Sequence, residues 1–105
     1  MRKISQDAAD SFHADKNFKN GNTQVISEDC GNVVRLYLFG NCIAQRTPLA
    51  TTITTDGWMT NTTKERLNAL NGVHINQEKG KWYLNGEPWN GDNVIIGAFG
   101  IWSGL

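Results

Sequence analysis

This chain of 105 residues has no excess of charge of either sign, because Lys plus Arg and Asp plus Glu number ten each. Proteins that bind phosphate backbones regardless of sequence depend on an excess of positive charge, and protein mimics of DNA depend on the opposite excess. The charge balance therefore argues against both classes. It leaves room for a local basic patch.

The chain also has few residues that could build a metal centre, a disulfide or a catalytic site. The two cysteines, Cys30 and Cys42, lie in or beside different turns, and the sequence contains no CxxC motif. His13 and His74 are far apart along the chain, so no zinc-ligand spacing is present. No paired carboxylates and no Ser/His or Cys/His set stand out. We expect two free thiols, no metal or other cofactor, and no enzymatic activity.

Long apolar segments are missing as well. The basic start at residues 1–3 is not followed by the apolar stretch of a signal peptide. The uncharged segment at residues 94–105 is too short for a membrane helix, and it fits a central strand or a contact between two copies of the chain. We therefore expect a cytoplasmic protein with no membrane partner. A homodimer through the uncharged C-terminal segment is one arrangement to test.

The local patterns predict helices and strands within one domain, residues 1–105, because this length supports a single modest core. Apolar residues at four-residue spacing predict an N-terminal helix over about residues 6–16, with Ser5 as its N-cap. Residues 18–23 are typical of a turn region.

After Thr23 the pattern becomes the alternation of an antiparallel meander. The expected strands of the meander are residues 23–28, 33–39 and 42–46. A turn at residues 40–41 would place Leu38 opposite Ile43 and Leu36 opposite Gln45.

A second helix is expected over residues 63–70. Thr62 lies three residues before Glu65, which is the spacing of a capping box at a helix start. A hairpin and a last uncharged strand follow this helix. The predicted fold is α+β, with an N-terminal helix, an antiparallel meander, the second helix, and a C-terminal hairpin plus one strand.

Two surfaces are candidate binding sites. The first surrounds the start of the second helix, where hydroxyls, amides and cations suit a protein partner or an anion. Its candidate residues are Trp58, Thr60, Asn61, Lys64, Arg66 and Asn68. The second is a sheet face that pairs aromatic rings with cations, as proteins that bind single-stranded nucleic acid do. Its candidate residues are Arg35, Tyr37, Phe39 and Arg46.

Each surface also has a structural interpretation. A capping box occupies the amide groups that an anion would need, and Lys64 and Arg66 point in divergent directions on a helix. Tyr37 and Phe39 would be core residues if their face of the sheet packs against helices.

Several short sequence patterns extend over most of the chain. The longest is W-x-T-x-T-T-x-x-R-L-N-A-L at residues 58–70. In these patterns the chain resembles a family of small proteins encoded by bacteriophages and prophages. Phe39 stands where that family often has a histidine. The resemblance implies a phage setting, hence the cytoplasm of an infected cell, and it brings no catalytic residue with it.

The expected function is therefore non-enzymatic binding of a host or phage protein by a phage accessory protein. Two alternatives stay open. One is a nucleic-acid-binding module that uses the basic and aromatic sheet face together with the helix. The other is a protein that sequesters a small ligand or a nucleotide.

Overall fold

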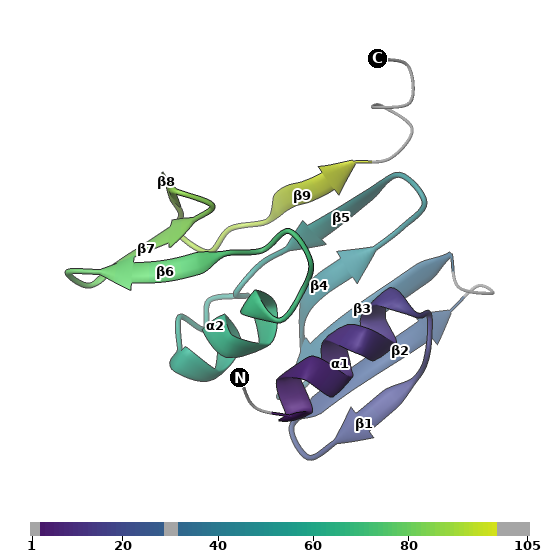
Figure 1. Ribbon diagram of the computed structural model, residues 1–105. Coiled ribbons are helices and arrows are strands. Elements are labelled where there is room, and N and C mark those ends of the chain that lie inside the picture. Colours follow the sequence, from purple (N-terminus) through teal and green to yellow (C-terminus); the bar gives the residue numbers. More distant parts are fainter. Residues whose placement is uncertain (1–2, 29–31, 99–105) are drawn as a thin grey trace.

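The computed structural model describes residues 3–28 and 32–98, which form two helices and two antiparallel sheets (Figure 1). The helices are α1 (Lys3–His13) and α2 (Asn61–Asn68). The larger sheet contains β1 (Phe18–Asn20), β2 (Thr23–Glu28), β3 (Val33–Leu38), β4 (Asn41–Arg46), β5 (Ala50–Ile53) and β9 (Val94–Ala98). The smaller sheet contains β6 (Ile75–Glu78), β7 (Lys81–Leu84) and β8 (Glu87–Pro88). The predicted α+β class is confirmed.

The larger sheet has the strand order β1-β2-β3-β4-β5-β9, so the predicted meander lies at its centre. The prediction of a turn region at residues 18–23 is wrong in part, because Phe18–Asn20 pairs with β2 as a short edge strand. Three residues are too few to show an alternating pattern. The strand is formed by its backbone pairing with β2, to which a tight turn joins it. The last strand, β9, is at the opposite edge and is not central.

The turn between β3 and β4 differs from the expected one by one residue. It is made by Phe39 and Gly40, whose φ angles are +52° and +80°, as in the two-residue turns that suit a twisted hairpin. The pairing register then shifts beyond Tyr37, so that Leu36 lies opposite Ala44. The predicted pairs of Leu36 and Leu38 are therefore wrong. An irregularity of this kind inserts a residue that alternation does not reveal.

Helix α1 covers β2 and β3 on one face of the larger sheet (Figure 1). Ala8, Ala9 and Phe12 are buried against that face. The helix begins and ends about three residues earlier than expected, and Ser5 lies inside it and not at its N-cap. The Ser5 hydroxyl is instead buried between the two helices, where it donates a hydrogen bond to Glu65 Oε1 at 2.8 Å.

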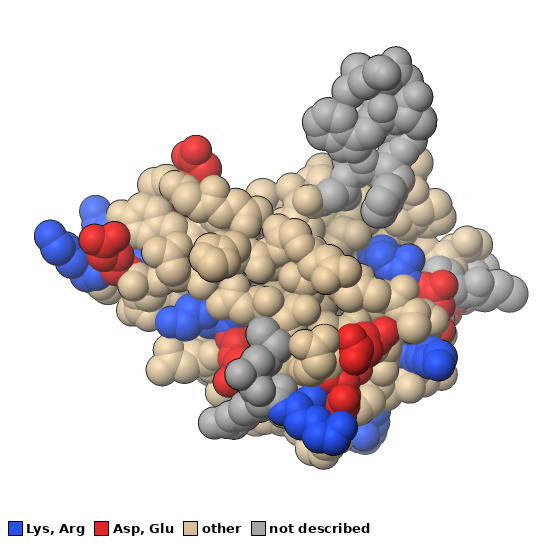
Figure 2. All heavy atoms as spheres, in the orientation of Figure 1, with Lys and Arg blue, Asp and Glu red and all other residues tan. Residues whose placement is uncertain are grey.

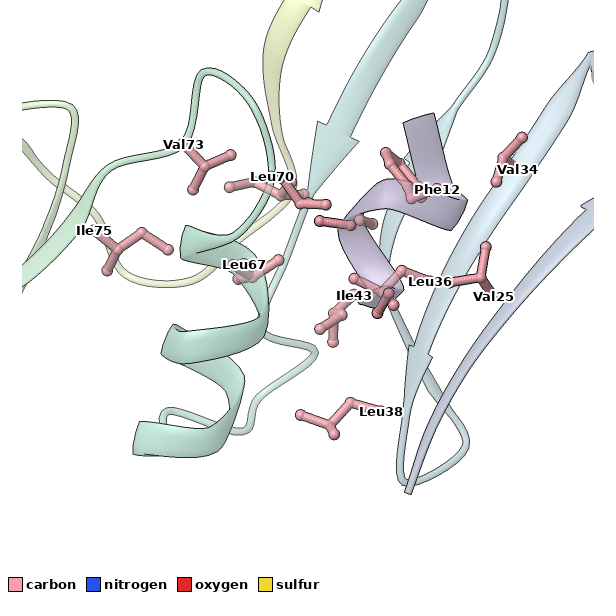
Figure 3. Close-up of a cluster of buried hydrophobic side chains, with 14 of the residues drawn as sticks. Phe12, Val25, Val34, Leu36, Leu38, Ile43, Leu67, Leu70, Val73 and Ile75 are labelled. Atoms are coloured by element: carbon pink, nitrogen blue, oxygen red, sulfur yellow. The ribbon is translucent and has the colours of Figure 1, made fainter. Parts of the chain in front are cut away.

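A continuous hydrophobic core extends from the larger sheet across α2 to the smaller sheet. Figure 3 shows Leu67 on α2 between Ile43 of the larger sheet and Ile75 of the smaller one. Trp82 and Leu84 of β7 extend this cluster. The helix thus holds the two sheets together through its apolar side, on which Leu67 is fully buried. Neither helix in the described residues is long and apolar enough to cross a membrane.

His13 joins the C-terminal end of α1 to the turn that follows α2. Its Nε2 accepts a hydrogen bond from the Asn71 backbone N–H at 3.1 Å. Burial lowers the pKa of His13, the nearby Arg46 guanidinium lowers it further, and Asp10 acts in the opposite direction. The folded protein therefore favours the neutral imidazole, which alone can accept this hydrogen bond.

We expect the free energy of unfolding to fall as the pH drops below the ordinary histidine pKa of about 6.5. Below this pH the histidine of the unfolded chain binds a proton more readily than the folded His13 does. The contribution of His13 to the free energy of unfolding is therefore fully present above this pH and is lost as the pH falls to the lowered pKa of the folded state. Urea unfolding at pH 7 and pH 5 measures the loss. His13→Gln keeps a hydrogen-bond acceptor without the titration, so it should lose less between these two pH values. An equal loss in the variant would contradict the assignment to His13.

Candidate functional site

The start of α2 is capped by Thr60, which has the extended backbone of an N-cap residue. Its Oγ1 accepts a hydrogen bond from the Thr63 backbone N–H at 3.2 Å. The predicted capping box of Thr62 and Glu65 is therefore wrong, and the helix begins at Asn61. Glu65 bonds to Ser5 and Arg66, so the contact between helices replaces the local one. One donor that an anion would need is already occupied by Thr60.

Arg66 is a buried side chain, with an exposed fraction of 3%. Its Nε donates to Thr23 Oγ1 at 2.9 Å, and its Nη1 donates to Ser5 Oγ at 2.8 Å and to Glu65 Oε1 at 2.9 Å. These bonds join α1, β2 and α2. Arg66 is thus a structural cation that a partner cannot reach, contrary to its place among the candidate binding residues.

Two other candidate residues of α2 face the smaller sheet. Lys64 donates a hydrogen bond to Gln77, and its Nζ lies 5.6 Å from the centre of the Trp82 ring. Asn68 bonds to both backbone groups of Ile75, as donor and as acceptor. The side chains of Asn61, Lys64, Glu65 and Asn68 line a shallow depression along the helix. They lie apart from Trp58 and Thr60.

Trp58 and Thr60 instead line an apolar pocket of about 420 Å³ between the turn before β4 and the start of α2. Its lining residues are Leu38, Phe39, Asn41, Ile43, Thr55, Trp58, Thr60 and Thr63. None of these carries a charge. Phe39 and Trp58 are the two large rings of the pocket, and they are 68% and 58% exposed. Exposed apolar groups that gather around a hollow are typical of a binding surface.

The loop that carries Trp58 is fixed by a close contact with Gly91. The Gly91 carbonyl accepts hydrogen bonds from the Thr55 backbone N–H and from Thr54 Oγ1, both at 2.9 Å. The Trp58 N–H in turn donates to the Thr55 carbonyl at 2.9 Å. The backbone of the loop that carries Trp58 is therefore anchored to Gly91.

Phe39 is held in an unusual backbone conformation. Its φ of +52° lies in the left-handed region that bulky side chains rarely adopt. Strained residues of this kind gather at functional sites. One feature of the sequence could have indicated the pocket, because Phe39-Gly40 and Asp56-Gly57-Trp58 each place a large aromatic ring beside a glycine turn. The meeting of these two turns in space could not be predicted from either.

The four residues of the candidate nucleic-acid surface do not form one face. Arg35 and Tyr37 lie half-buried on the sheet face away from the helices, where Arg35 bonds to Gln45 and Glu28. Arg46 lies on the helix face, where it donates to the Phe12 carbonyl and pairs with Asp15. The register shift in the hairpin moves Arg46 to this side. The predicted cluster is thus divided. Arg35 and Tyr37 lie on one face of the sheet, Arg46 lies on the other, and Phe39 lies in the β3–β4 turn.

Two features of the described residues bear on metal binding and on the reactivity of cysteine. The described residues contain no group of three or more His, Cys, Asp or Glu side chains placed to hold a metal ion. Cys42 is a free, half-buried cysteine, and burial raises the pKa of its thiol, which weakens it as a nucleophile. Cys30 and the last residues of the uncharged segment, 99–105, lie outside the described residues, so the predictions for them stay predictions.

In Figure 2 most of the charged side chains lie at the end around α1 and β1 and at the tip of the β6–β7 hairpin, and the surface between them is largely uncharged. No continuous basic surface is visible on this face.

Comparisons with known proteins show one family relationship. A family model described as Kyanoviridae Gp96 protein matches residues 1–99. None of the curated proteins and none of the solved structures matches the chain. Because the family model spans nearly the whole sequence, the chain belongs to the Kyanoviridae Gp96 family of bacteriophage proteins.

Proposed function

We propose that this phage protein is a non-enzymatic accessory protein that binds a protein of the host or of the phage. The observation that carries the proposal is the apolar pocket with Phe39 and Trp58 at its rim. Large aromatic side chains contribute much of the binding energy at protein interfaces, above all around a pocket that excludes water. The bound group is then an apolar side chain of the partner.

The charge distribution favours this partner over a nucleotide or a nucleic acid. A phosphate group requires cations or free backbone amides. The pocket has no cationic lining residue, Lys64 lies against Trp82, and Arg66 is buried. Thr60 already caps the helix that begins beside the pocket.

A small apolar ligand is the second candidate. The pocket volume of about 420 Å³ lies within the range of small-molecule sites, roughly 300–1,000 Å³. A ligand that binds only the folded state must raise the melting temperature. Thermal-shift screening with apolar compounds and with nucleotides therefore tests this candidate. Stabilisation by an apolar compound that is lost in Trp58→Ala would support it.

The main proposal is tested by capture of partners from phage-infected cells on the immobilised full chain. A partner should be retained by the wild type and lost with Trp58→Ser. The matched control is Leu49→Ser, because Leu49 is 72% exposed and does not line the pocket. The captured protein is then purified and its affinity for each variant is measured. Equal affinity for wild type and Trp58→Ser would refute the pocket as the contact, and capture of nucleic acid alone, weakened by salt, would favour the nucleic-acid alternative.

Phe39→Asn separates binding from stability. Asparagine tolerates the positive φ of this turn position better than phenylalanine does, so the free energy of unfolding should rise by about 0.5–1 kcal/mol. The same change removes one ring from the pocket, and affinity for the partner should fall about tenfold or more. Chemical denaturation and titration calorimetry measure the two effects. A variant that is less stable, or that binds as the wild type does, would contradict the role given to Phe39.

A further inference from the structure

Four asparagines of this chain are each followed by a glycine, namely Asn20, Asn71, Asn85 and Asn90. An asparagine in such a pair is chemically labile, because the backbone nitrogen of the next residue can attack the carbon of the side-chain amide. A glycine nitrogen is the least hindered one, since glycine has no Cβ. The pair is the same at all four positions, so the fold decides which of them can react.

The side-chain amides of Asn85 and Asn90 are held in place. Asn85 Nδ2 donates a hydrogen bond to the Gly72 carbonyl at 3.1 Å, and Asn85 Oδ1 accepts one from the His74 N–H at 2.9 Å. Asn90 Nδ2 donates to Asp92 Oδ2, and Asn90 Oδ1 accepts from the Asp92 N–H, both at 3.0 Å. An attack on either amide carbon would require these bonds to break first.

The Asn71 side chain is exposed, and it has no hydrogen-bond partner within residues 3–28 and 32–98. Its backbone N–H donates to His13 Nε2 at 3.1 Å, and the carbonyl of Gly72 accepts from Asn85. These bonds fix the groups on either side of the Asn71–Gly72 peptide. Within the same residues the Asn71 carbonyl and the Gly72 N–H have no partner. This peptide can therefore rotate toward the side chain while the flanking bonds remain, and glycine permits such a rotation.

Asn20 also has an exposed side chain without a hydrogen-bond partner in the part of the chain that the structure describes. Its backbone, however, lies in β1 opposite Thr23. A residue in a strand is extended, so the rotation that brings the next nitrogen to the amide carbon would disrupt this pairing. Asn71 is thus the one of the four whose reaction breaks the fewest hydrogen bonds.

We propose that Asn71 is a site of spontaneous deamidation. The Gly72 nitrogen forms a bond to Asn71 Cγ, the Cγ–Nδ2 bond breaks, and ammonia leaves with the proton from the Gly72 nitrogen. The product is a cyclic succinimide. Water then opens the ring at one of its two carbonyl carbons, and the residue becomes aspartate or isoaspartate.

Both products change the joint between the two helices. Each carries a new carboxylate in the turn after α2, and isoaspartate also lengthens the main chain by a methylene group. The hydrogen bonds from Asn71 to His13 and from Asn85 to Gly72 flank this insertion, so isoaspartate displaces at least one of them. Deamidation therefore weakens the contact between α1 and the turn after α2. The apolar pocket takes no part in this chemistry, which is independent of the function proposed above.

Mass spectrometry of peptides from the full chain, incubated folded at neutral pH, measures each asparagine separately. Asn71 should deamidate at least about tenfold faster than Asn85, because two hydrogen bonds must open before Asn85 can react. In guanidinium chloride, where the chain is unfolded, the four sites should react at similar rates. If any of the other three reacted as fast as Asn71 in the folded protein, the proposal would be overturned. An Asn71 that reacts only in the unfolded chain would overturn it as well.

Asn71→Gln is the matched control for the effect on stability. Glutamine keeps an exposed amide, but its longer side chain must close a larger ring and reacts much more slowly. After incubation the wild type should contain a fraction that unfolds at a lower urea concentration than fresh protein does, and Asn71→Gln should contain no such fraction. An equal loss of stability in both proteins would contradict the role of Asn71.

Discussion

Arg66→Ala is expected to lower the free energy of unfolding by about 3 kcal/mol, a large part of the roughly 5–15 kcal/mol typical of a domain. The variant loses three hydrogen bonds that a buried guanidinium donates to Thr23, Ser5 and Glu65. It also leaves a cavity where α1, β2 and α2 meet. Urea denaturation measures the change, and the melting temperature should fall by more than about 10 °C.

Two further variants identify the source of this stabilisation. Arg66→Lys keeps the charge, but an ammonium group cannot reproduce the planar arrangement of the guanidinium donors, so an intermediate loss is expected. Lys16→Ala removes an exposed cation and should change stability by less than about 0.5 kcal/mol. If Arg66→Ala resembled Lys16→Ala, the buried cluster would not stabilise the fold.

Gly91→Ala is expected to destabilise the protein by about 3 kcal/mol and to disturb the pocket. A Cβ at this position would lie 2.3 Å from Thr55 Oγ1 and 2.7 Å from Met59 Sδ. The methionine can move, but Thr55 is buried and its backbone N–H is bonded to Gly91. The clash adds about 1–3 kcal/mol of overpacking to the strain of a φ of +91°. Thermal unfolding measures the loss of stability, and titration with the captured partner measures the loss of affinity.

Gly86→Ala is the matched control. Gly86 has a similar φ of +86°, but a Cβ there meets nothing within 4 Å, so only the conformational strain remains. The double variant Gly91→Ala with Thr55→Ala removes the hydroxyl that clashes and should recover part of the stability. Equal losses in Gly91→Ala and Gly86→Ala would show that the close approach to Thr55 has no energetic weight.

Much of the fold follows from local patterns. Alternation predicted β2, β3 and β4, and apolar residues at four-residue spacing predicted the N-terminal helix, although it begins and ends about three residues earlier than expected. These patterns work because each side of a strand or helix meets one environment over several residues. Strand β1 and the exact start of each helix were not predicted. A strand of three residues depends on the neighbouring strand with which it pairs, and a helix start depends on the contacts of its capping residues.

The candidate site was predicted in pieces. Trp58 and Thr60 were assigned to a surface on the second helix, and Phe39 to a sheet face. The structure brings all three to one pocket, because the β3–β4 turn and the loop before α2 meet at the same end of the sheet. Arg66 was assigned to the same surface as Trp58 and Thr60, but the structure shows that its side chain is buried.

The sequence by itself determined the α+β class, the meander and the absence of a large charge excess, since these depend on composition and on local periodicity. The tertiary structure alone decided which residues share a site and which strands lie at the edges of the sheet. Register, burial and the approach of distant turns depend on contacts between segments far apart along the chain. The pocket between Phe39 and Trp58 therefore cannot be predicted from any single segment of the chain.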